Sequence, residues 1–214
     1  MRIKGSALNA RLQYISSEFS DSELNRVLES LNDEDQLVFS AVNKRLDPDT
    51  WYPFALSTRL DKAIVDVIGQ GDWRFFERLG EAAAKHNLTT IHQHLLVKDN
   101  PQAFLQKATE VYHTYRDEGR QQYVVTGPCS GILSTYEVED ASPANCRTII
   151  GWYKEAIRLC GASHVTAIEG NCRARGADHC RCLFFWQMPT ESGASKDMHR
   201  DERERLMRRG SLAR

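Results

Sequence analysis

The chain has 214 residues, of which 41% are hydrophobic and 27% charged, proportions typical of a globular protein. Its formal net charge of −1 argues against a nucleic-acid-binding protein. It contains no apolar run of about 18 residues, and its first ten residues lack the apolar core of a signal peptide. We therefore expect a cytoplasmic protein that makes no contact with a membrane and keeps its cysteines reduced.

Apolar residues recur at helical spacing through the first half of the chain. Four segments have this spacing: 4–15, 20–31, 51–71 and 72–87. Ser20 or Asp21 is the expected N-cap of the second, and Pro53 marks the start of the third. A further helix is predicted at about 101–118, between a proline and a glycine. We interpret residues 1–98 as a helical N-terminal part.

The pattern changes after residue 119. Short β-branched segments predict four strands, at 121–128, 130–139, 164–172 and 179–186. The intervening segment 142–161 predicts a helix with Ser142 or Asn145 as its N-cap. Helices followed by a ββαββ order predict an α+β fold, in which the N-terminal helices pack with a C-terminal antiparallel-sheet unit. We place this second part at residues 99–188, as one compact unit with the first, and expect 189–214 to be a flexible charged tail.

Three of the six cysteines lie in the stretch CRARGADHCRC, residues 172–182. A loop centred on Gly176 joins the last two predicted strands and brings Cys172 close to Cys180. Cys146 lies in the first turn of the preceding helix, where the helix dipole favours a thiolate, and this helix can pack over the hairpin.

Together with Glu169 the three cysteines supply three thiolates and one carboxylate. This set, Cys146, Glu169, Cys172 and Cys180, suits a closed tetrahedral zinc site with a structural role. Inert buried thiols are the alternative, and we expect Cys129 and Cys160 to be of that kind. A disulfide is disfavoured in a reducing compartment.

Two stretches, GRQQYVVTGPCSGILSTYEVED and CRTIIGWYKEAIRLCGASHVTAIEGNCRARGADHCRC, resemble a 4-vinyl-reductase type domain over about residues 100–187. That domain belongs to a superfamily with haem-NO-binding domains and trafficking-complex subunits, and it forms the sensor module of phenol-responsive bacterial activators. The resemblance implies a structural zinc held by Cys146, Glu169, Cys172 and Cys180. The N-terminal half more loosely resembles uncharacterised bacterial paralogues.

The chain departs from this pattern in three ways. It has no tryptophan between Trp73 and Trp152, so the phenol specificity of the sensors is not implied. It lacks the Tyr-x-Ser-x-Arg signature of the haem-binding branch, so haem is not implied either. It also has no room for the ATPase and DNA-binding domains that follow the sensor in the activators.

We find no Walker loop, no GxGxxG and no nucleophile elbow, which argues against an enzyme. We expect instead a sensory or regulatory module that binds a small apolar or aromatic ligand and is read by a protein partner, with a homodimer as one arrangement. A ligand-free adaptor or scaffold is the alternative, and an enzyme is the third hypothesis.

The expected ligand pocket lies between the helix at 101–118, the helix at 146–160 and the sheet. Its expected lining is Phe104, Val111, Tyr115, Val125 and Trp152, residues that would otherwise be ordinary core. A volume of about 300 Å³ or more would support ligand sensing. His92 and His94 form a metal pair if they alternate on a strand, but a surface turn is the favoured interpretation.

Overall fold

A computed structural model of the chain describes residues 1–137 and 141–189. It confirms the α+β class. The helices are α1 (Gly5–Glu18), α2 (Asp21–Glu29), α3 (Asp33–Ala41), α4 (Phe54–Val67), α5 (Phe75–Thr89), α6 (Pro101–Gln106), α7 (Ala108–Tyr115) and α8 (Pro143–Leu159). The strands are β1 (Arg2–Lys4), β2 (Trp51–Pro53), β3 (Arg120–Gly127), β4 (Ser130–Tyr136), β5 (Ser163–Glu169) and β6 (Cys180–Gln187). The expected tail lies outside the described residues except for Pro189.

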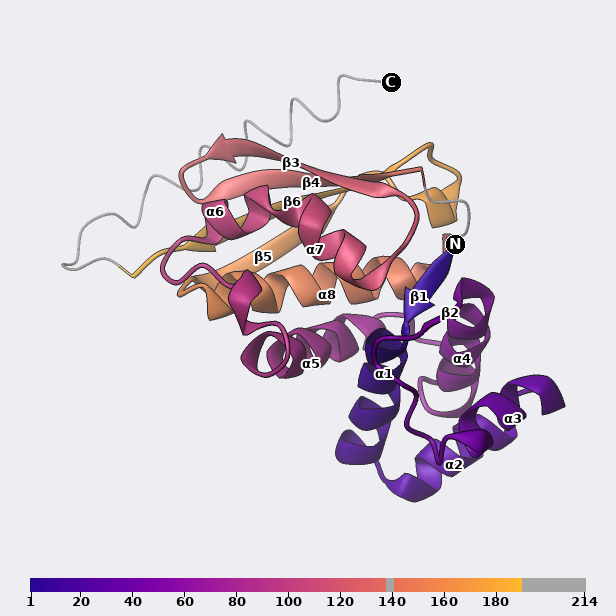
Figure 1. Cartoon of the computed structure of the whole chain (residues 1–214). Helices are drawn as coiled ribbons and strands as arrows, with labels where there is room; N and C mark the ends of the chain where they lie inside the picture. Colours follow the sequence, from indigo (N-terminus) through magenta and orange to yellow (C-terminus); the bar gives the residue numbers. More distant parts are fainter. Residues whose placement is uncertain (138–140, 190–214) are drawn as a thin grey trace.

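The C-terminal half has the predicted ββαββ order. Strands β3, β4, β6 and β5 lie side by side in that order, and every neighbouring pair is antiparallel. Helix α8 lies under this sheet, α5 lies beside α8, and α1 to α4 form a separate helical layer (Figure 1). The inner face of β6 contributes Cys182, Phe184 and Trp186 to the core, which alternate as residues of one strand face must.

Capping side chains explain where several helices begin. The Ser20 hydroxyl accepts a hydrogen bond from the Glu23 backbone N–H, and the Ser142 hydroxyl accepts one from the Asn145 N–H. Of the two predicted caps at each helix, the serine is therefore the one used. Each cap satisfies one of the N–H groups that a helix start leaves without an intrahelical partner.

The sequence prediction is corrected at one helix, and it missed two elements. The helix predicted at 101–118 is two helices, α6 and α7, because the chain makes a tight turn at Lys107, whose N–H bonds to the Phe104 carbonyl. The short ribbon of β1 and β2 was not predicted, because three residues are too few to show an alternating pattern. Helix α3, which Asn32 caps, was also not predicted.

Helices α5 and α8 approach each other at two glycines. A Cβ on Gly151 of α8 would lie 1.9 Å from the Glu77 carbonyl oxygen, and one on Gly80 of α5 would lie 2.1 Å from that of Thr148. Each glycine therefore faces the backbone of the opposite helix. This contact ties α5, and through it the N-terminal helices, to the sheet unit.

Within residues 1–137 and 141–189, no helix combines the length and the apolar composition needed to cross a bilayer.

Candidate functional site

The structure brings three of the four predicted ligand residues together. The Cys146 sulfur lies 3.5 Å from that of Cys172 and 3.7 Å from that of Cys180. All three sulfurs lie within 4.8 Å of one another. Sulfurs bound to one ion at about 2.3 Å in a tetrahedral arrangement are about 3.8 Å apart, so this spacing suits a shared metal ion. We call these three residues the thiol cluster.

Each element places its cysteine for a local reason. Cys146 lies in the first turn of α8, directly after the capping turn of Ser142. Cys172 precedes the single 3₁₀ turn Arg173–Arg175, which Gly176 ends in the left-handed conformation at φ +88°. That turn folds the chain back, so that Cys180 at the start of β6 returns to Cys172.

The contacts within the thiol cluster separate the acidities of its members. A hydrogen bond from the Cys146 thiol, together with one from the Arg173 backbone N–H, lowers the pKa of Cys180 to about 6. The same contact with Cys180, and then burial, raise the pKa of Cys146. Burial raises the pKa of Cys172. The contacts of the cluster therefore favour the thiolate form at Cys180 and the protonated form at Cys146.

The fourth predicted ligand, Glu169, has other partners. Its Oε2 pairs with Arg175 at 2.9 Å and with Arg147 at 3.2 Å, and its side chain is only 10% exposed. It does not belong to the group of ligand atoms that lie within 4.8 Å of one another. The carboxylate stands at the rim of the cluster, where it lines the same 40 Å³ pocket as Cys146 and Cys180.

A second feature is a cavity of about 70 Å³ that is partly open to solvent, which we call the central cavity. Its walls come from α1, α5, α7, α8 and β3, so both halves of the chain contribute. It is lined by Ala7, Ala10, Arg11, Ala83, Asn87, Val111, Tyr112, Tyr115, Arg116, Gln121, Thr148, Ile149, Trp152 and Tyr153.

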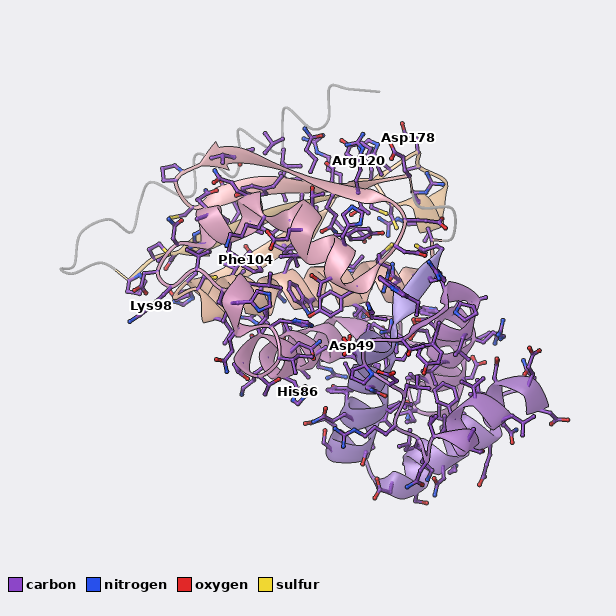
Figure 2. The ribbon with its side chains drawn as sticks, viewed as in Figure 1. Asp49, His86, Lys98, Phe104, Arg120 and Asp178 are labelled. Atoms are coloured by element: carbon purple, nitrogen blue, oxygen red, sulfur yellow. The ribbon has the colours of Figure 1, made fainter. Side chains whose placement is uncertain are left out.

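Three of the five predicted pocket residues, Val111, Tyr115 and Trp152, line the central cavity. Phe104 does not line it; its ring is fully buried and stacks on Trp152 at 6.2 Å, in the layer between sheet and helices (Figure 2). Val125 is 50% exposed and lies beside the register shift near the end of β3. The predicted location therefore contains a cavity, but one well below the 300 Å³ expected for a drug-sized ligand.

Two buried arginines of the central cavity were not predicted from the sequence. Arg11 is 2% exposed and forms a two-point ion pair with Asp61, at 2.6 and 3.1 Å. Arg116 is 6% exposed and donates to the Asn145 side chain. Arg11 falls on the apolar face of α1 between Leu8 and Leu12, and that position was the available signal.

His92 and His94 lie at the short 3₁₀ helix Gln93–Leu95, a turn rather than a strand. Their rings are 6.0 Å apart, and that of His92 packs edge-on against Tyr115 at 5.4 Å. Among the described residues they are not part of a metal-binding group. The turn interpretation therefore agrees with their place in the fold.

This placement predicts a pH effect. Burial, and then the neighbouring His94, lower the pKa of His92. The unfolded chain then binds more protons than the folded one below pH about 6.5, so the free energy of unfolding falls as the pH drops through that value. We expect His92→Gln to reduce the slope of stability against pH between 6.5 and 5, measured by urea unfolding, and His94→Gln to reduce it less. An unchanged slope in His92→Gln would contradict this prediction.

Comparison with known proteins shows which solved structures share this fold. No protein-family model and no curated protein matches the chain, but its structure is similar to solved H-NOX domains. An unliganded Fe(II) H-NOX protein from K. algicida is 12% identical, with a TM-score of 0.67 over 89% of this chain and 100% of that one. An H-NOX protein from S. oneidensis in the Fe(II)NO state is 15% identical, with a TM-score of 0.59 over 86% and 99%. The chain therefore has the H-NOX fold.

The comparison corrects the predicted cofactor. Zinc was expected, whereas the proteins that share the fold are described with Fe(II), haem or porphyrin. The resemblance to the haem-NO-binding superfamily agrees with the fold; the narrower likeness to 4-vinyl-reductase domains and phenol sensors stays a prediction.

The residues of this chain do not fit a haem. Drug-sized ligands occupy roughly 300–1,000 Å³, and the central cavity has about 70 Å³. None of the described residues that line it is a histidine, the proximal haem ligand of globins and peroxidases. A wider cleft of about 490 Å³ between α1 and α5 includes His86, but more than half of its lining residues are polar, and His86 is exposed there (Figure 2).

Proposed function

We propose that the protein is a sensory or regulatory module in which a small molecule in the central cavity alters the packing of the N-terminal helices against the sheet unit. The observation that supports the proposal is that the walls of the central cavity come from both halves of the chain. Ala7 and Ala10 come from α1, whereas Val111, Trp152 and Tyr153 come from the sheet unit. A ligand there touches both halves at once, and its binding energy can shift how they pack.

The size of the central cavity sets the size of the ligand. A water site needs about 10–15 Å³, and an engineered cavity of about 150 Å³ holds benzene. A volume of about 70 Å³ lies between these values. The ligand is then larger than water and smaller than an aromatic ring, and a protein partner reads its presence.

The second part of the proposal is that the thiol cluster binds a thiophilic metal ion that stabilises the sheet unit. The ion would clamp the start of α8 to the β5–β6 hairpin through Cys146, Cys172 and Cys180. Glu169 is the proposed fourth ligand and has to leave Arg147 and Arg175 to bind. Four protein ligands leave no position for a substrate, so the role would be structural.

We test the metal site with Co²⁺ and Cd²⁺ added to the chelator-treated protein. One equivalent of Co²⁺ should produce the thiolate charge-transfer absorption and raise the melting temperature, because binding adds to the stability of the folded state. Cys172→Ser should lose both effects, whereas Cys129→Ser, outside the cluster, should keep them. Glu169→Gln should weaken binding less than Cys172→Ser. Equal Co²⁺ binding by Cys172→Ser would contradict the site.

Native mass spectrometry of the purified protein tests the sensor as a whole. It reports a retained small molecule, a metal ion and the number of subunits in one measurement. A retained acyclic molecule of at most about six heavy atoms is the expected result, since the ring of benzene needs a cavity about twice as large.

The adaptor is the second candidate, and the small volume of the central cavity favours it. Phe104, Trp152 and Tyr153 pack ring against ring beside the cavity and fill much of the space between sheet and helices. If the protein retains no molecule and no small molecule stabilises it, the adaptor replaces the sensor.

A further inference from the structure

Arg116 is a buried cation without a carboxylate partner in the described part of the chain. Its Nη2 donates to the Asn145 side chain and its Nη1 to the Tyr115 carbonyl, both neutral acceptors. Its Nε is buried and has no hydrogen-bond partner. A buried charge that is not paired costs several kcal/mol, so such an arrangement calls for a counter-ion.

The surroundings of Arg116 do not supply this counter-ion. Asp61, a buried carboxylate that acts on it, is already held by Arg11. Asp117 accepts two hydrogen bonds from Arg2, one from its backbone N–H and one from its side chain. Burial therefore lowers the pKa of Arg116 to about 10, which still leaves it charged at neutral pH.

Arg116 lines the central cavity, together with Arg11. No acidic side chain is among the described residues that line it. The two cations of the lining therefore share one carboxylate, Asp61, which pairs with Arg11 and does not line the cavity. The Tyr115 hydroxyl is a second unused donor there, because it is buried and donates no hydrogen bond. The side-chain amide of Asn87, which also lines the cavity, is the polar group that acts on this hydroxyl. The remaining lining is largely apolar, with Ala83, Val111 and Ile149 among it.

The cleft next to the central cavity has the same sign of charge. Ala10 and Asn87 line both the cavity and the cleft between α1 and α5, so the two spaces adjoin. Lys44 and Arg45 line the cleft, and no acidic side chain is among its described lining residues. A cleft lined by one sign of charge concentrates ions of the opposite sign.

We propose that the ligand of the central cavity is a small carboxylate of one to four carbons, whose anionic head is paired with Arg116 and whose short apolar body packs against the alanines and Trp152. This inference rests on the proposed sensory function and names its ligand class. The planar guanidinium matches the two oxygens of a carboxylate.

The contacts of Arg116 explain how a bound anion would change the packing of the elements around it. The Arg116 backbone pairs with Ile3 of β1, and its side chain holds Asn145, which directly precedes Cys146. The guanidinium also lies 5.1 Å from the Phe54 ring of α4. A bound carboxylate therefore acts on the N-terminal ribbon, on α4 and on the start of α8 at once.

The test uses the full chain with sodium formate, acetate, propionate and butyrate, each at constant ionic strength against sodium chloride. Acetamide, which has the shape of acetate but no charge, is the matched neutral probe. We expect at least one carboxylate to raise the melting temperature saturably, by about 3 °C at tenfold excess over its Kd. Broadening of the ¹³C resonance of labelled carboxylate should report the same binding directly.

Three variants locate the effect. Arg116→Met and Ala83→Val should lose it, the first by removing the guanidinium and the second by filling the cavity. Arg120→Met, the same change at an exposed arginine, should keep it. Should Arg116→Met fail to fold, Ala83→Val alone decides, because it keeps the charge.

Equal stabilisation by acetamide and acetate, or a carboxylate effect that survives in Ala83→Val, would overturn the assignment. So would the absence of a saturable effect from all four carboxylates. If native mass spectrometry then finds a retained neutral molecule, the sensory function stands and only the ligand class is wrong.

Discussion

Replacing Gly151 by alanine is expected to destabilise the protein by at least about 2 kcal/mol. The new Cβ would lie 1.9 Å from the Glu77 carbonyl oxygen, and a backbone atom of α5 cannot move aside as a flexible side chain can. A clash this close with a backbone atom lies at or above the upper end of the usual overpacking cost of about 1–3 kcal/mol, and the better helix propensity of alanine offsets only about 1 kcal/mol of it. Urea unfolding measures the loss as a lower midpoint at an unchanged slope.

Gly80→Ala should act in the same direction, since its Cβ would meet the Thr148 carbonyl oxygen at 2.1 Å. The matched control is Gly170→Ala, whose Cβ would have its nearest neighbour at 3.7 Å, an ordinary contact. We expect the double variant to lose less stability than the sum of the two single losses. Either substitution alone already forces α5 and α8 apart, so the second clash costs little more. A Gly151→Ala protein within about 0.5 kcal/mol of the wild type would show that the helices are not packed this closely.

The second large effect is expected for Asp61→Asn. Asp61 is 1% exposed and accepts two hydrogen bonds from the Arg11 guanidinium. The amide leaves that guanidinium buried without a counter-charge, next to the already unpaired Arg116. Breaking a buried pair on one side costs about 3–5 kcal/mol, and urea unfolding should show a loss of this order.

Two further variants separate the charge from the packing. Arg11→Met combined with Asp61→Leu removes both charges, and it should recover most of the loss because an apolar replacement of similar volume tolerates burial. Asp66→Asn on the same helix breaks an exposed pair with Lys62 and should cost less than about 1 kcal/mol. If Asp61→Asn costs no more than Asp66→Asn, the Arg11 pair does not stabilise the fold.

Local patterns determined the architecture of the sheet unit. The four strands, the helix between them and the glycine turn at Gly176 follow from β-branched runs and from residues that stop an element, which act over a few neighbours. The serine caps at Ser20 and Ser142 are local for the same reason. The N-terminal helices were also found this way, except α3, and the turn at Lys107 was missed because the helical spacing continues across it.

The thiol cluster shows where sequence spacing reaches its limit. The glycine turn places Cys172 near Cys180, and the packing of α8 on the sheet adds Cys146, as the spacing indicated. The position of Glu169 depends on Arg147 from α8 and Arg175 from the loop, two charges whose approach no spacing reveals. Zinc was inferred from these residues, whereas the proteins that share the fold are described with haem or Fe(II); the sequence resemblance indicated the haem-NO-binding superfamily but not this cofactor.

The central cavity was decided by the tertiary structure alone. Its walls come from five elements spread between Ala7 and Tyr153, so no local pattern contains it. Val125 was expected to line the space between the helices and the sheet but is half exposed, and Arg116 was overlooked because a charged residue at a helix end usually faces solvent. Whether a buried charge is paired or free to bind an anion depends on the side chains around it. For Arg116 these surroundings form only when α1, α5, α7 and α8 pack together.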